Sequence, residues 1–256
     1  MRPLSVAIIT YNEESNIERC LSSVAGLADE IVVVDSFSTD RTRDICEKYN
    51  VTFVQHRFEG YIEQKNFALA QTTHDFVLLL DADEALSPQL FNTVSAQKEN
   101  DFPYVAYSMN RCTNYCGKFI RHGLWYPDRK LRLFNKQYGR WGGINPHDKI
   151  ELQAAYPVKW LKGDLFHYSY NSVEEHAAQN ERFSTISADA LYRQGKKNGL
   201  VKLMFSPLWA FLNGYLFRLG FLDGYAGWVV AVKTAQLTYL KYRKLQLRYF
   251  ANKAKS

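Results

Sequence analysis

The sequence predicts an α/β fold built on a doubly wound, mostly parallel β-sheet. Three observations lead to this prediction: short apolar runs that are continuous and do not alternate, segments of helical period between them, and polar clusters directly after the runs. Continuous β-branched and aliphatic runs are typical of strands that are buried on both faces of a parallel sheet. Strands that alternate with helices at this spacing form βαβ units. The expected strands are Val6–Ile9, Ile31–Val34, Val51–Val54 and Phe76–Leu80.

Two helices are expected between these strands. In the first, apolar residues recur at i, i+3, i+4 and i+7, which places them on one face of an amphipathic helix. These residues are Ile17, Cys20, Leu21 and Val24. The segment Thr39–Tyr49, between the second and third strands, is the other helix candidate.

The chain after residue 100 has a more mixed pattern. Tyr104–Met109 and Lys130–Phe134 are expected strands, separated by loops that contain Gly, Trp and Asn. Ser172–Gly195 has the pattern of a helix, and the aromatic segment that follows predicts further helices. We therefore expect an α/β domain with a first half (1–100) and a second half (101–195), followed by a basic, aromatic helical tail (196–256).

The positive charge of the chain is concentrated at its C-terminal end. The net charge is +6, and residues 224–256 contain seven Lys and Arg residues and no Asp or Glu, so that the rest of the chain carries about −1. A nucleic-acid enzyme would spread basic residues over its working face, so we expect no nucleic-acid partner. A polybasic arm beside an aromatic stretch suits an anionic membrane surface, which makes the tail a membrane-associating appendage. The alternative is that the tail is a helical cap packed on the sheet. One face of the tail can pack on the sheet while another face meets the membrane.

The expected location is cytoplasmic, peripheral on the inner face of the cytoplasmic membrane. Met1 is followed directly by a strand-like run, so no secretory signal is expected. The weakly charged stretch 203–232 contains Pro207, Arg218 and Asp223, and such residues are costly at the centre of a bilayer. We therefore expect this stretch to lie on the membrane without crossing it. The four cysteines are expected to be reduced thiols.

Three polar clusters directly follow three of the expected strands. Thr10–Glu13 follows the first strand, Asp35–Asp40 the second and Asp81–Glu84 the fourth. In an open α/β sheet, ligands bind beyond the carboxyl ends of the strands. We therefore expect the three clusters to meet at one edge of the sheet and to form the ligand site.

Asp81 and Asp83 are two carboxylates at period two, so both can face one pocket at the end of a strand. Two close carboxylates repel each other unless a cation compensates their charge, and hard oxygen ligands suit Mg²⁺ or Mn²⁺ bridging a diphosphate. A solvated acidic turn is the alternative. No loop of the form GxxxxGK[ST] or GxGxxG follows an expected strand, which argues against kinases, P-loop NTPases and dehydrogenases.

Seven motifs along the chain carry a family resemblance. They are Thr10–Glu13, Val34–Asp40, Gln64–Leu69, Asp81–Asp83, Arg132–Asn135, Pro146–Lys149 and Leu165–Tyr170. The first four, in order within about the first 85 residues, resemble the family 2 glycosyltransferases. The last three are similar, more loosely, to the lipopolysaccharide core glucosyltransferase branch of that family.

The resemblance implies a GT-A-like domain whose first half binds a nucleotide sugar and whose second half binds the acceptor. It implies an inverting, metal-dependent glycosyltransferase that uses Mn²⁺ or Mg²⁺. The enzyme would move a hexose, glucose, from a UDP-sugar to a lipid-linked glycan acceptor such as the lipopolysaccharide inner core. Alternatives are transfer to a polyprenyl phosphate or a capsule intermediate, and a sugar nucleotidyltransferase. A sugar nucleotidyltransferase would show a Gly-rich basic loop in place of Thr10–Glu13. A further alternative, a non-catalytic membrane-docking protein, would leave the polar clusters unexplained.

The resemblance also assigns the donor contacts. Asp83 would ligate the metal, and Asp81 would contact the ribose or the donor sugar. The residues that would contact the uracil and ribose are Thr10, Tyr11, Glu13, Asp35 and Lys65. Two positions depart from the family pattern: the usual acidic-Gly-Ser-Thr turn is Ser36–Thr39, and the usual Arg is Lys65, which lacks the planar fork of a guanidinium.

In the acceptor half, the resemblance places an acidic residue after a histidine, and Asp148 occupies this position. We expect Asp148 to be the general base that accepts the proton of the acceptor hydroxyl. A loop-capping pair with His147 is the alternative. His167 is expected either to ligate the metal or to be structural.

Three further residues are candidates for acceptor binding. Trp125 and Trp141 are expected in loops, where their rings would either stack on sugars or pack in the core. Arg132 alternates with apolar neighbours and would share a strand face with Lys130. This basic pair would either meet phosphates or be solvated.

Overall fold

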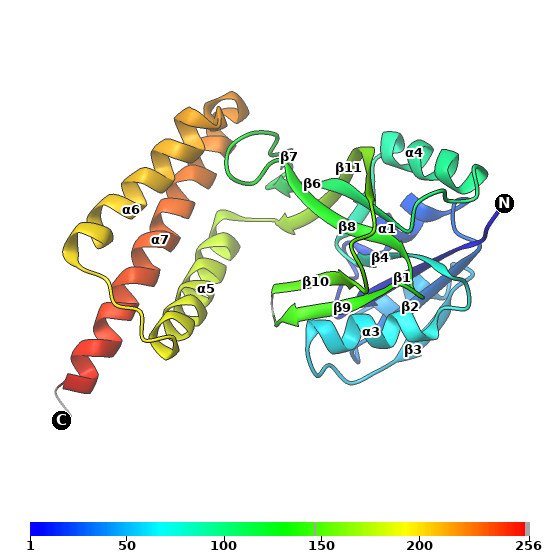
Figure 1. Ribbon diagram of the computed structural model, residues 1–256, viewed down its shortest axis with the longest axis horizontal. Coiled ribbons are helices and arrows are strands. Elements are labelled where there is room, and N and C mark those ends of the chain that lie inside the picture. The colour runs from blue at the N-terminus through cyan, green and yellow to red at the C-terminus, as the bar shows by residue number, and fades with distance from the viewer. Residues whose placement is uncertain (146, 254–256) are drawn as a thin grey trace. The chain divides into compact units, whose positions relative to one another are not determined.

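The computed structural model describes residues 1–145 and 147–253, and the chain forms two compact units. The first unit consists of residues 1–111 and 128–168, and the second of residues 112–127 and 169–256. Figure 1 shows the large sheet with its helices in the first unit and the long helices of the second. Pro146, which belongs to one of the motifs above, and tail residues 254–256 lie outside the described residues.

Four parallel strands form the N-terminal part of the sheet, in the order β3-β2-β1-β4. They are β1 (Leu4–Thr10), β2 (Glu30–Asp35), β3 (Thr52–Gln55) and β4 (Phe76–Asp81), and all four overlap the expected strands. In this register Thr10 lies opposite Asp35 and Ile9 lies opposite Asp81. The carboxyl ends of β1, β2 and β4 therefore meet, and the predicted α/β fold class is confirmed.

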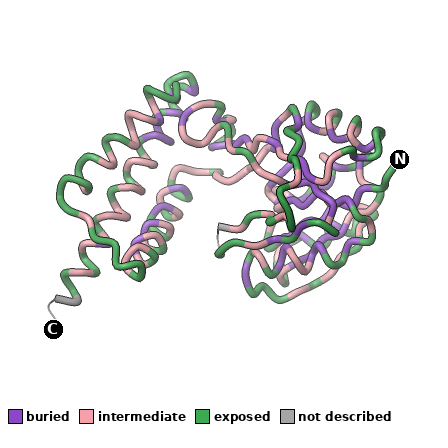
Figure 2. Tube along the Cα trace, viewed as in Figure 1, coloured by how far each residue is buried: buried purple, intermediate pink, exposed green. Residues whose placement is uncertain are grey.

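Helices cover both faces of the parallel strands, which is the doubly wound arrangement. One apolar cluster joins α1 (Ile17–Val24), α2 (Thr42–Cys46) and α4 (Pro88–Glu99) to one face of the strands. The other cluster joins α3 (Tyr61–Gln71) to the opposite face. Figure 2 shows the buried residues concentrated in the strands between these layers. β1, β2 and β4 are buried on both faces, which explains their continuous apolar runs, whereas β3 lies at the edge of the sheet and is partly exposed.

The helix expected at Thr39–Tyr49 is shorter in the structure, where α2 spans Thr42–Cys46. The residues before it form a loop that is bonded to the loop after β1. The carboxylate of Asp40 accepts hydrogen bonds from the backbone N–H of Glu14 and of Thr42, both at 3.0 Å. These side-chain bonds compete with helix formation, as Asp residues near helix starts commonly do.

The rest of the first unit adds strands in antiparallel pairs. β8 (Asp128–Asn135) pairs with β4, β6 (Ala106–Tyr115) pairs with β8, and β5 (Glu84–Leu86) pairs with β11 (Val158–Tyr170). The full order is β3-β2-β1-β4-β8-β6-β11-β5. β9 (Gly139–Ile144) and β10 (His147–Leu152) form a separate antiparallel hairpin, which the sequence analysis did not predict.

The second unit is built mainly from helices. They are α5 (Val173–Arg193), α6 (Leu200–Leu212), the π-helix η1 (Asn213–Phe217), the 3₁₀-helix η2 (Gly220–Asp223) and α7 (Gly224–Lys253), and the short strand β7 (Lys118–Phe119) pairs with the end of β6. The apolar cluster of this unit includes Tyr115, Ile120, Val229 and Val230. By length and composition alone, the segment Leu200–Phe217 qualifies as a candidate membrane span.

The helix α5 belongs to this second unit, whereas the sequence-based division places it in the segment 101–195. Its buried polar residues explain the difference. The side-chain amide of Asn180 donates to the backbone oxygen of Lys233 on α7 at 2.9 Å. The ring of His176 lies 3.1 Å from the hydroxyl of Tyr115. Helical period alone does not identify the partner against which a helix packs.

Candidate active site

A cleft of about 700 Å³ lies in the first unit, at the carboxyl ends of β1 and β4. Ser36, directly after β2, also lines it. The polar clusters that follow β1, β2 and β4 therefore meet at one edge of the sheet, as expected. Six of the residues selected from the sequence line this cleft: Thr10, Tyr11, Glu13, Asp81, Asp83 and His167.

Asp35 lies beside this cleft at the end of β2, with only 1% of its surface exposed. Its carboxylate accepts hydrogen bonds from the backbone N–H of Ser38 at 2.9 Å and from the amide of Gln55 at 3.3 Å. These bonds shape the turn after β2, in which Phe37 adopts a left-handed conformation with φ of 61°. Asp35 therefore organises this turn in addition to any contact with a ligand.

Glu13 is a partly buried carboxyl group on the cleft wall. Burial raises the pKa of Glu13 to about 7. A hydrogen bond from Asn16 opposes this shift, and the neighbouring carboxylates of Asp83, Asp40 and Asp81 add to it. That bond, from the Asn16 amide to Glu13 Oε2, measures 2.8 Å. Near neutral pH the carboxyl group is therefore poised to donate or to accept a hydrogen bond to a ligand.

Asp83 and His167 face each other in the cleft. The ring Nε2 of His167 lies 3.2 Å from Oδ2 of Asp83, and the backbone N–H of Tyr168 donates to the backbone oxygen of Asp83 at 2.9 Å. Within the described residues, no group of three or more His, Cys, Asp or Glu side chains is arranged to hold a metal ion. A carboxylate and an imidazole that share an open cleft nevertheless fit Mg²⁺ or Mn²⁺, because these ions take remaining ligands from water and substrate phosphates.

Asp81 is held between two cations at the floor of the cleft. Lys65 Nζ lies 3.1 Å from Oδ1 of Asp81, and Arg132 donates to Oδ2 at 3.2 Å. Burial raises the pKa of this carboxyl, but the charges of Lys65 and Arg132 outweigh it and hold the pKa well below the usual value. Asp81 is therefore a carboxylate at any physiological pH.

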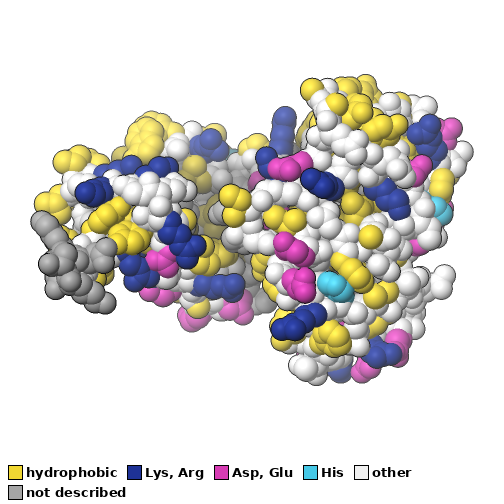
Figure 3. All heavy atoms as spheres, turned by 60° about the horizontal axis from the view of Figure 1, so that its bottom comes forward, with side chains coloured by type: hydrophobic (Ala, Val, Ile, Leu, Met, Phe, Trp, Pro, Cys, Tyr) yellow, Lys and Arg dark blue, Asp and Glu magenta, His cyan; other side chains and the backbone are white. Residues whose placement is uncertain are grey.

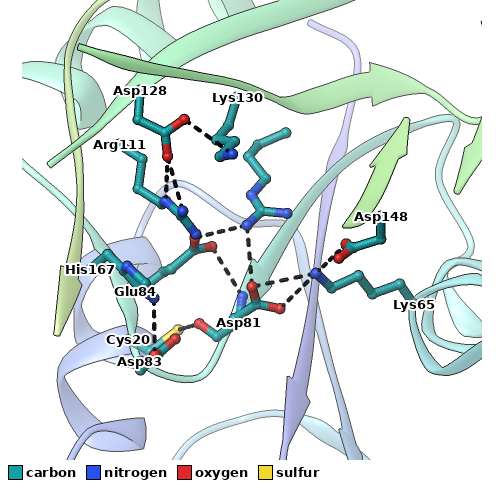
Figure 4. Close-up of polar contacts among 11 residues, drawn as sticks. Cys20, Lys65, Asp81, Asp83, Glu84, Arg111, Asp128, Lys130, Asp148 and His167 are labelled. Carbon is teal, nitrogen blue, oxygen red and sulfur yellow. Dashed lines mark hydrogen bonds and ion pairs between the residues drawn. The ribbon is translucent and has the colours of Figure 1, made fainter. Parts of the chain in front are cut away.

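Lys65 joins Asp81 to Asp148, the expected general base. Its ammonium lies 2.7 Å from Oδ2 of Asp148, which the hairpin β9–β10 contributes. The Lys65 side chain is only 3% exposed and Asp148 is 14% exposed. Figure 4 shows Lys65 pointing between the two carboxylates. Residues that are 83 positions apart thus meet in one buried ion pair.

The ion pairs continue away from the cleft as a chain of alternating charges. Arg132 donates to Glu84 at 2.8 Å, and Glu84 is completely buried. Arg111 lies 3.8 Å from the same Glu84 oxygen and 2.9 Å from Asp128. Figure 4 shows the series from Asp148 to Asp128 and Lys130. Its charges compensate one another, which is the condition for burying ionised groups.

Arg132 is therefore a buried member of this ion-pair chain and does not line the cleft. Burial lowers the pKa of Arg132, but the carboxylates of Glu84 and Asp81 outweigh this effect and raise it. The expectation of an open strand face shared with Lys130 differs from the structure, since Lys130 pairs with Asp128 at 3.1 Å. Arg132 takes its partners from β4 and β5, through Asp81 and Glu84, whereas Lys130 takes its partner from β8 itself.

The two tryptophans also lie outside the cleft lining. Trp141 is part of strand β9, not of a loop, and is 3% exposed. Its ring covers the ammonium of Lys65, with Nζ 4.5 Å from the ring centroid. Trp125 belongs to the second unit, where it stacks on Tyr170. For both residues the structure shows packing, the alternative that the sequence left open.

The sequence analysis missed two groups of residues at this site. Glu84 follows the Asp81-Ala82-Asp83 triplet directly and lies in the buried ion-pair chain, but one more acidic residue gave no separate signal. Phe58 and Tyr61 line the cleft with partly exposed rings in edge-to-face contact at 5.1 Å. They flank Gly60, whose position before α3 was not predicted.

The chain is similar to several known proteins. The family model described as glycosyl transferase family 2 matches residues 5–164. An uncharacterized glycosyltransferase of Rickettsia typhi is 32% identical, over 96% of this chain and 87% of that protein. The lipopolysaccharide core biosynthesis glycosyltransferase LpsC of Rhizobium meliloti is 29% identical, over 96% of this chain and 93% of that protein. The crystal structure of S. aureus TarS 1-349 in complex with UDP-GlcNAc aligns with a TM-score of 0.48, at 16% identity over 95% of this chain and 92% of that chain.

Proposed function

The chain belongs to glycosyl transferase family 2, and on this premise we propose that it is an inverting enzyme that moves glucose from a UDP-sugar to a lipid-linked glycan. The likeness to a lipopolysaccharide core glycosyltransferase over nearly the whole chain supports the lipopolysaccharide inner core as the acceptor. The single observation that carries the proposal is the convergence of Asp81, Asp83 and His167 in one open cleft. This arrangement suits a nucleoside diphosphate whose charge a divalent cation neutralises.

The donor binds in this cleft. Thr10 lines it, and its buried hydroxyl has no hydrogen-bond partner among the described residues, so a donor hydroxyl or base can satisfy it. Tyr11 offers an exposed ring for the uracil, and Glu13, which lines the cleft, binds the ribose or base. Asp35, at 1% exposure, acts on the ribose or base through the turn that it holds after β2. Lys65 acts on the donor indirectly, because its ammonium is already bonded to Asp81 and Asp148.

Asp83 and His167 would hold Mn²⁺ or Mg²⁺, which stabilises the negative charge of the departing diphosphate. Asp148 accepts the proton of the acceptor hydroxyl, while the hydroxyl oxygen forms a bond to the anomeric carbon and UDP leaves with the electrons of the broken bond. The Lys65 ion pair holds the Asp148 carboxylate in place. No covalent glycosyl-enzyme is required in this scheme, which inverts the anomeric centre.

The enzyme works as a peripheral protein on the cytoplasmic face of the membrane. The likeness to an enzyme of lipopolysaccharide core biosynthesis supports this location, since a lipid-linked acceptor is held at a membrane surface. The basic, aromatic segment 196–256 supplies the attachment to anionic lipids.

A donor screen tests the proposal. We expect release of UDP from UDP-glucose when lipid-linked core acceptor and Mn²⁺ are present, and little release when either is withheld. Replacement of the acceptor by a polyprenyl phosphate or a capsule intermediate tests the alternative acceptors. Release of pyrophosphate from UTP and a sugar phosphate would instead identify a nucleotidyltransferase, and indifference of donor affinity to Mn²⁺ would contradict the metal-assisted scheme.

A further inference from the structure

One face of α6 is an exposed apolar stripe. Its side chains recur at i, i+1, i+4, i+5, i+8 and i+9, which places them on one side of the helix. These residues are Leu200, Val201, Met204, Phe205, Leu208 and Trp209, and each is between 52% and 72% exposed. None of the residues of α6 is buried. Figure 2 shows α6 free of buried segments along its length.

The apolar stripe continues beyond α6 into η1, η2 and the start of α7. Leu216 and Phe217 of η1 and Phe221 and Leu222 of η2 are all at least 43% exposed, and Tyr225 at the start of α7 is 80% exposed. Monomeric proteins rarely leave contiguous apolar surface of this extent in water. A partner that covers it would therefore remove a large unfavourable contact with solvent.

The charged side chains between residues 190 and 222, the segment that carries most of this apolar stripe, are all positive. Residues 190–222 contain five Lys and Arg residues and no Asp or Glu. They are Arg193, Lys196, Lys197, Lys202 and Arg218, and all five are exposed. Figure 3 shows hydrophobic side chains beside lysines and arginines on the helical part of the surface. Cations around an aromatic and aliphatic stripe are complementary to anionic headgroups above acyl chains.

The cations of α7, which the sequence analysis assigned to the membrane, are used differently. Lys244 lies 2.6 Å from a carboxylate oxygen of Glu181 and donates to the hydroxyl of Ser184 at 2.8 Å. Arg248 is paired with Asp189 at 2.7 Å. Both bind α5 within the same unit. These two cations of the tail therefore hold two helices together.

We propose that the stripe on α6, extended by η1 and η2, docks on an anionic lipid bilayer and lies in the plane of its interface. The inference rests on the proposed function, because a lipid-linked acceptor brings the enzyme to a membrane. The segment Leu200–Phe217 does not cross the bilayer, since α6 carries the exposed Lys202 and packs along α7, which carries Lys233 and Lys241. The aromatic rings enter the headgroup boundary and the lysines meet lipid phosphates.

Vesicle co-sedimentation of the full chain tests this surface. The probes are phosphatidylcholine vesicles with and without phosphatidylglycerol. We expect binding only to the anionic vesicles, and about tenfold weaker binding for the double variant Phe205→Ser, Trp209→Ser, because two anchoring rings are lost. Phe250→Ser removes an equally exposed aromatic ring, at 67%, from α7 and serves as the matched control. Its binding should equal that of the wild type.

Charge variants separate the two basic segments. Lys196→Gln, Lys197→Gln and Lys202→Gln together should weaken binding and flatten its salt dependence. Lys241→Gln with Arg243→Gln should have a much smaller effect. Equal losses for the two sets, or full binding by the Phe205, Trp209 variant, would overturn the assignment to α6.

Two further measurements keep the outcome unambiguous. Brominated lipids should quench wild-type fluorescence, with less quenching in Trp209→Phe and no change in Trp160→Phe. If light scattering instead shows a wild-type dimer that the Phe205, Trp209 variant dissociates, a second copy of the chain covers the stripe and the lipid assignment is wrong. Mn²⁺-dependent binding of UDP-glucose, measured by calorimetry, should be equal in all variants. Its absence in the wild type would refute the proposed function and leave the lipid surface standing.

Discussion

Lys65 is a buried cation that forms ion pairs with two carboxylates, to which we assign different roles. Asp81 faces the donor cleft and Asp148 is the proposed base, and the ammonium lies within 3.1 Å of both. The Trp141 ring covers this ammonium and shields it from water. Because the three charges are desolvated together, the removal of one leaves the others uncompensated.

Lys65→Met should therefore reduce both stability and turnover. We expect a loss of about 3 kcal/mol in the free energy of unfolding, since breaking a buried pair leaves an unpaired charge. Turnover should fall because Asp148 is no longer held. Urea denaturation and steady-state kinetics check both effects, and Lys65→Arg, which keeps the charge, should recover most of the stability. Unchanged kinetics in Lys65→Met would show that the ion pair has no part in transfer.

Substitutions at Asp83 and Asp148 should have separate effects, the first on donor binding and the second on transfer. Asp83→Ala should abolish Mn²⁺-dependent binding of UDP-glucose, because it removes the carboxylate that would hold the ion. Asp148→Asn should bind the donor like the wild type but lower kcat by a factor of roughly 10² to 10⁴, the usual contribution of a general base. Calorimetry with and without Mn²⁺ measures the first effect and turnover the second. Asp75→Asn, exposed and outside the cleft lining, is the control.

The hairpin β9–β10 is the element that brings Asp148 to the cleft. It is fixed to α3 by a reciprocal pair of bonds: the Asn66 amide donates to the backbone oxygen of Trp141 at 2.9 Å and accepts from its backbone N–H at 3.0 Å. At the hairpin turn, Asn145 accepts from the backbone N–H of Ile62 at 3.1 Å, in the first turn of α3. The position of the base therefore depends on contacts between two elements.

Asn66→Ala should loosen this hairpin without touching the donor residues. We expect a lower kcat with a nearly unchanged KM for UDP-glucose, and a stability loss of about 2 kcal/mol, because two partly buried backbone groups lose their partner. Asn92→Ala, an exposed position on α4, should change neither value. A rise in KM with kcat preserved would place the effect of Asn66 on the donor.

In the second unit, His176 makes the helical packing sensitive to pH. Its ring lies among Tyr115, Trp125 and Tyr170, and burial, with a smaller effect of Lys233, lowers the pKa of His176 to about 4. Burial also raises the pKa of the Tyr115 hydroxyl to about 12, so this partner stays neutral. Neutral His176 is thus the form that the native packing selects.

The contribution of neutral His176 to the free energy of unfolding is fully present above pH 6.5, the ordinary pKa of histidine. It is lost as the pH falls toward about 4. The unfolded chain takes up the proton first, so acid favours unfolding. Solvent screening reduces the full linkage value, and we expect a loss of about 2 kcal/mol over this range. Urea titrations at several pH values check it. His176→Gln should flatten the dependence, whereas His74→Gln should keep it, and equal curves for all three proteins would contradict the assignment.

At the scale of the whole molecule, the two compact units carry different tasks. Every residue that lines the cleft belongs to the first unit, and the apolar stripe of α6 belongs to the second. α7 packs on α5 through contacts that include Lys244 with Glu181, and Leu245 of α7 is 1% exposed. This part of α7 therefore belongs to the framework of the second unit.

Deletion of the residues after Lys233 should destabilise the second unit and leave the first intact. We expect faster proteolysis of α5 and weaker vesicle binding, with donor hydrolysis in the absence of acceptor unchanged, because the cleft uses residues of the first unit only. Limited proteolysis followed by mass spectrometry locates the cleavage. Loss of donor hydrolysis, or α5 as resistant as in the full chain, would contradict this division of tasks.

The sequence by itself determined the parallel strands, the meeting of their polar ends and the family. Continuous apolar runs such as Ile31–Val34 report burial on both faces, and topology then brings Thr10, Asp35 and Asp81 to one edge. These are consequences of local pattern and of chain direction. They do not depend on which side chains finally touch.

Only the tertiary structure decided the partners of the charged and aromatic residues. Lys65 meets Asp148, Arg132 meets Glu84 and Lys244 meets Glu181, and each pair joins elements far apart in the chain. A basic residue has the same local pattern whether it faces phosphate, lipid or a buried carboxylate. The choice depends on long-range packing, which sets whether the charge is compensated inside the protein or left for a ligand.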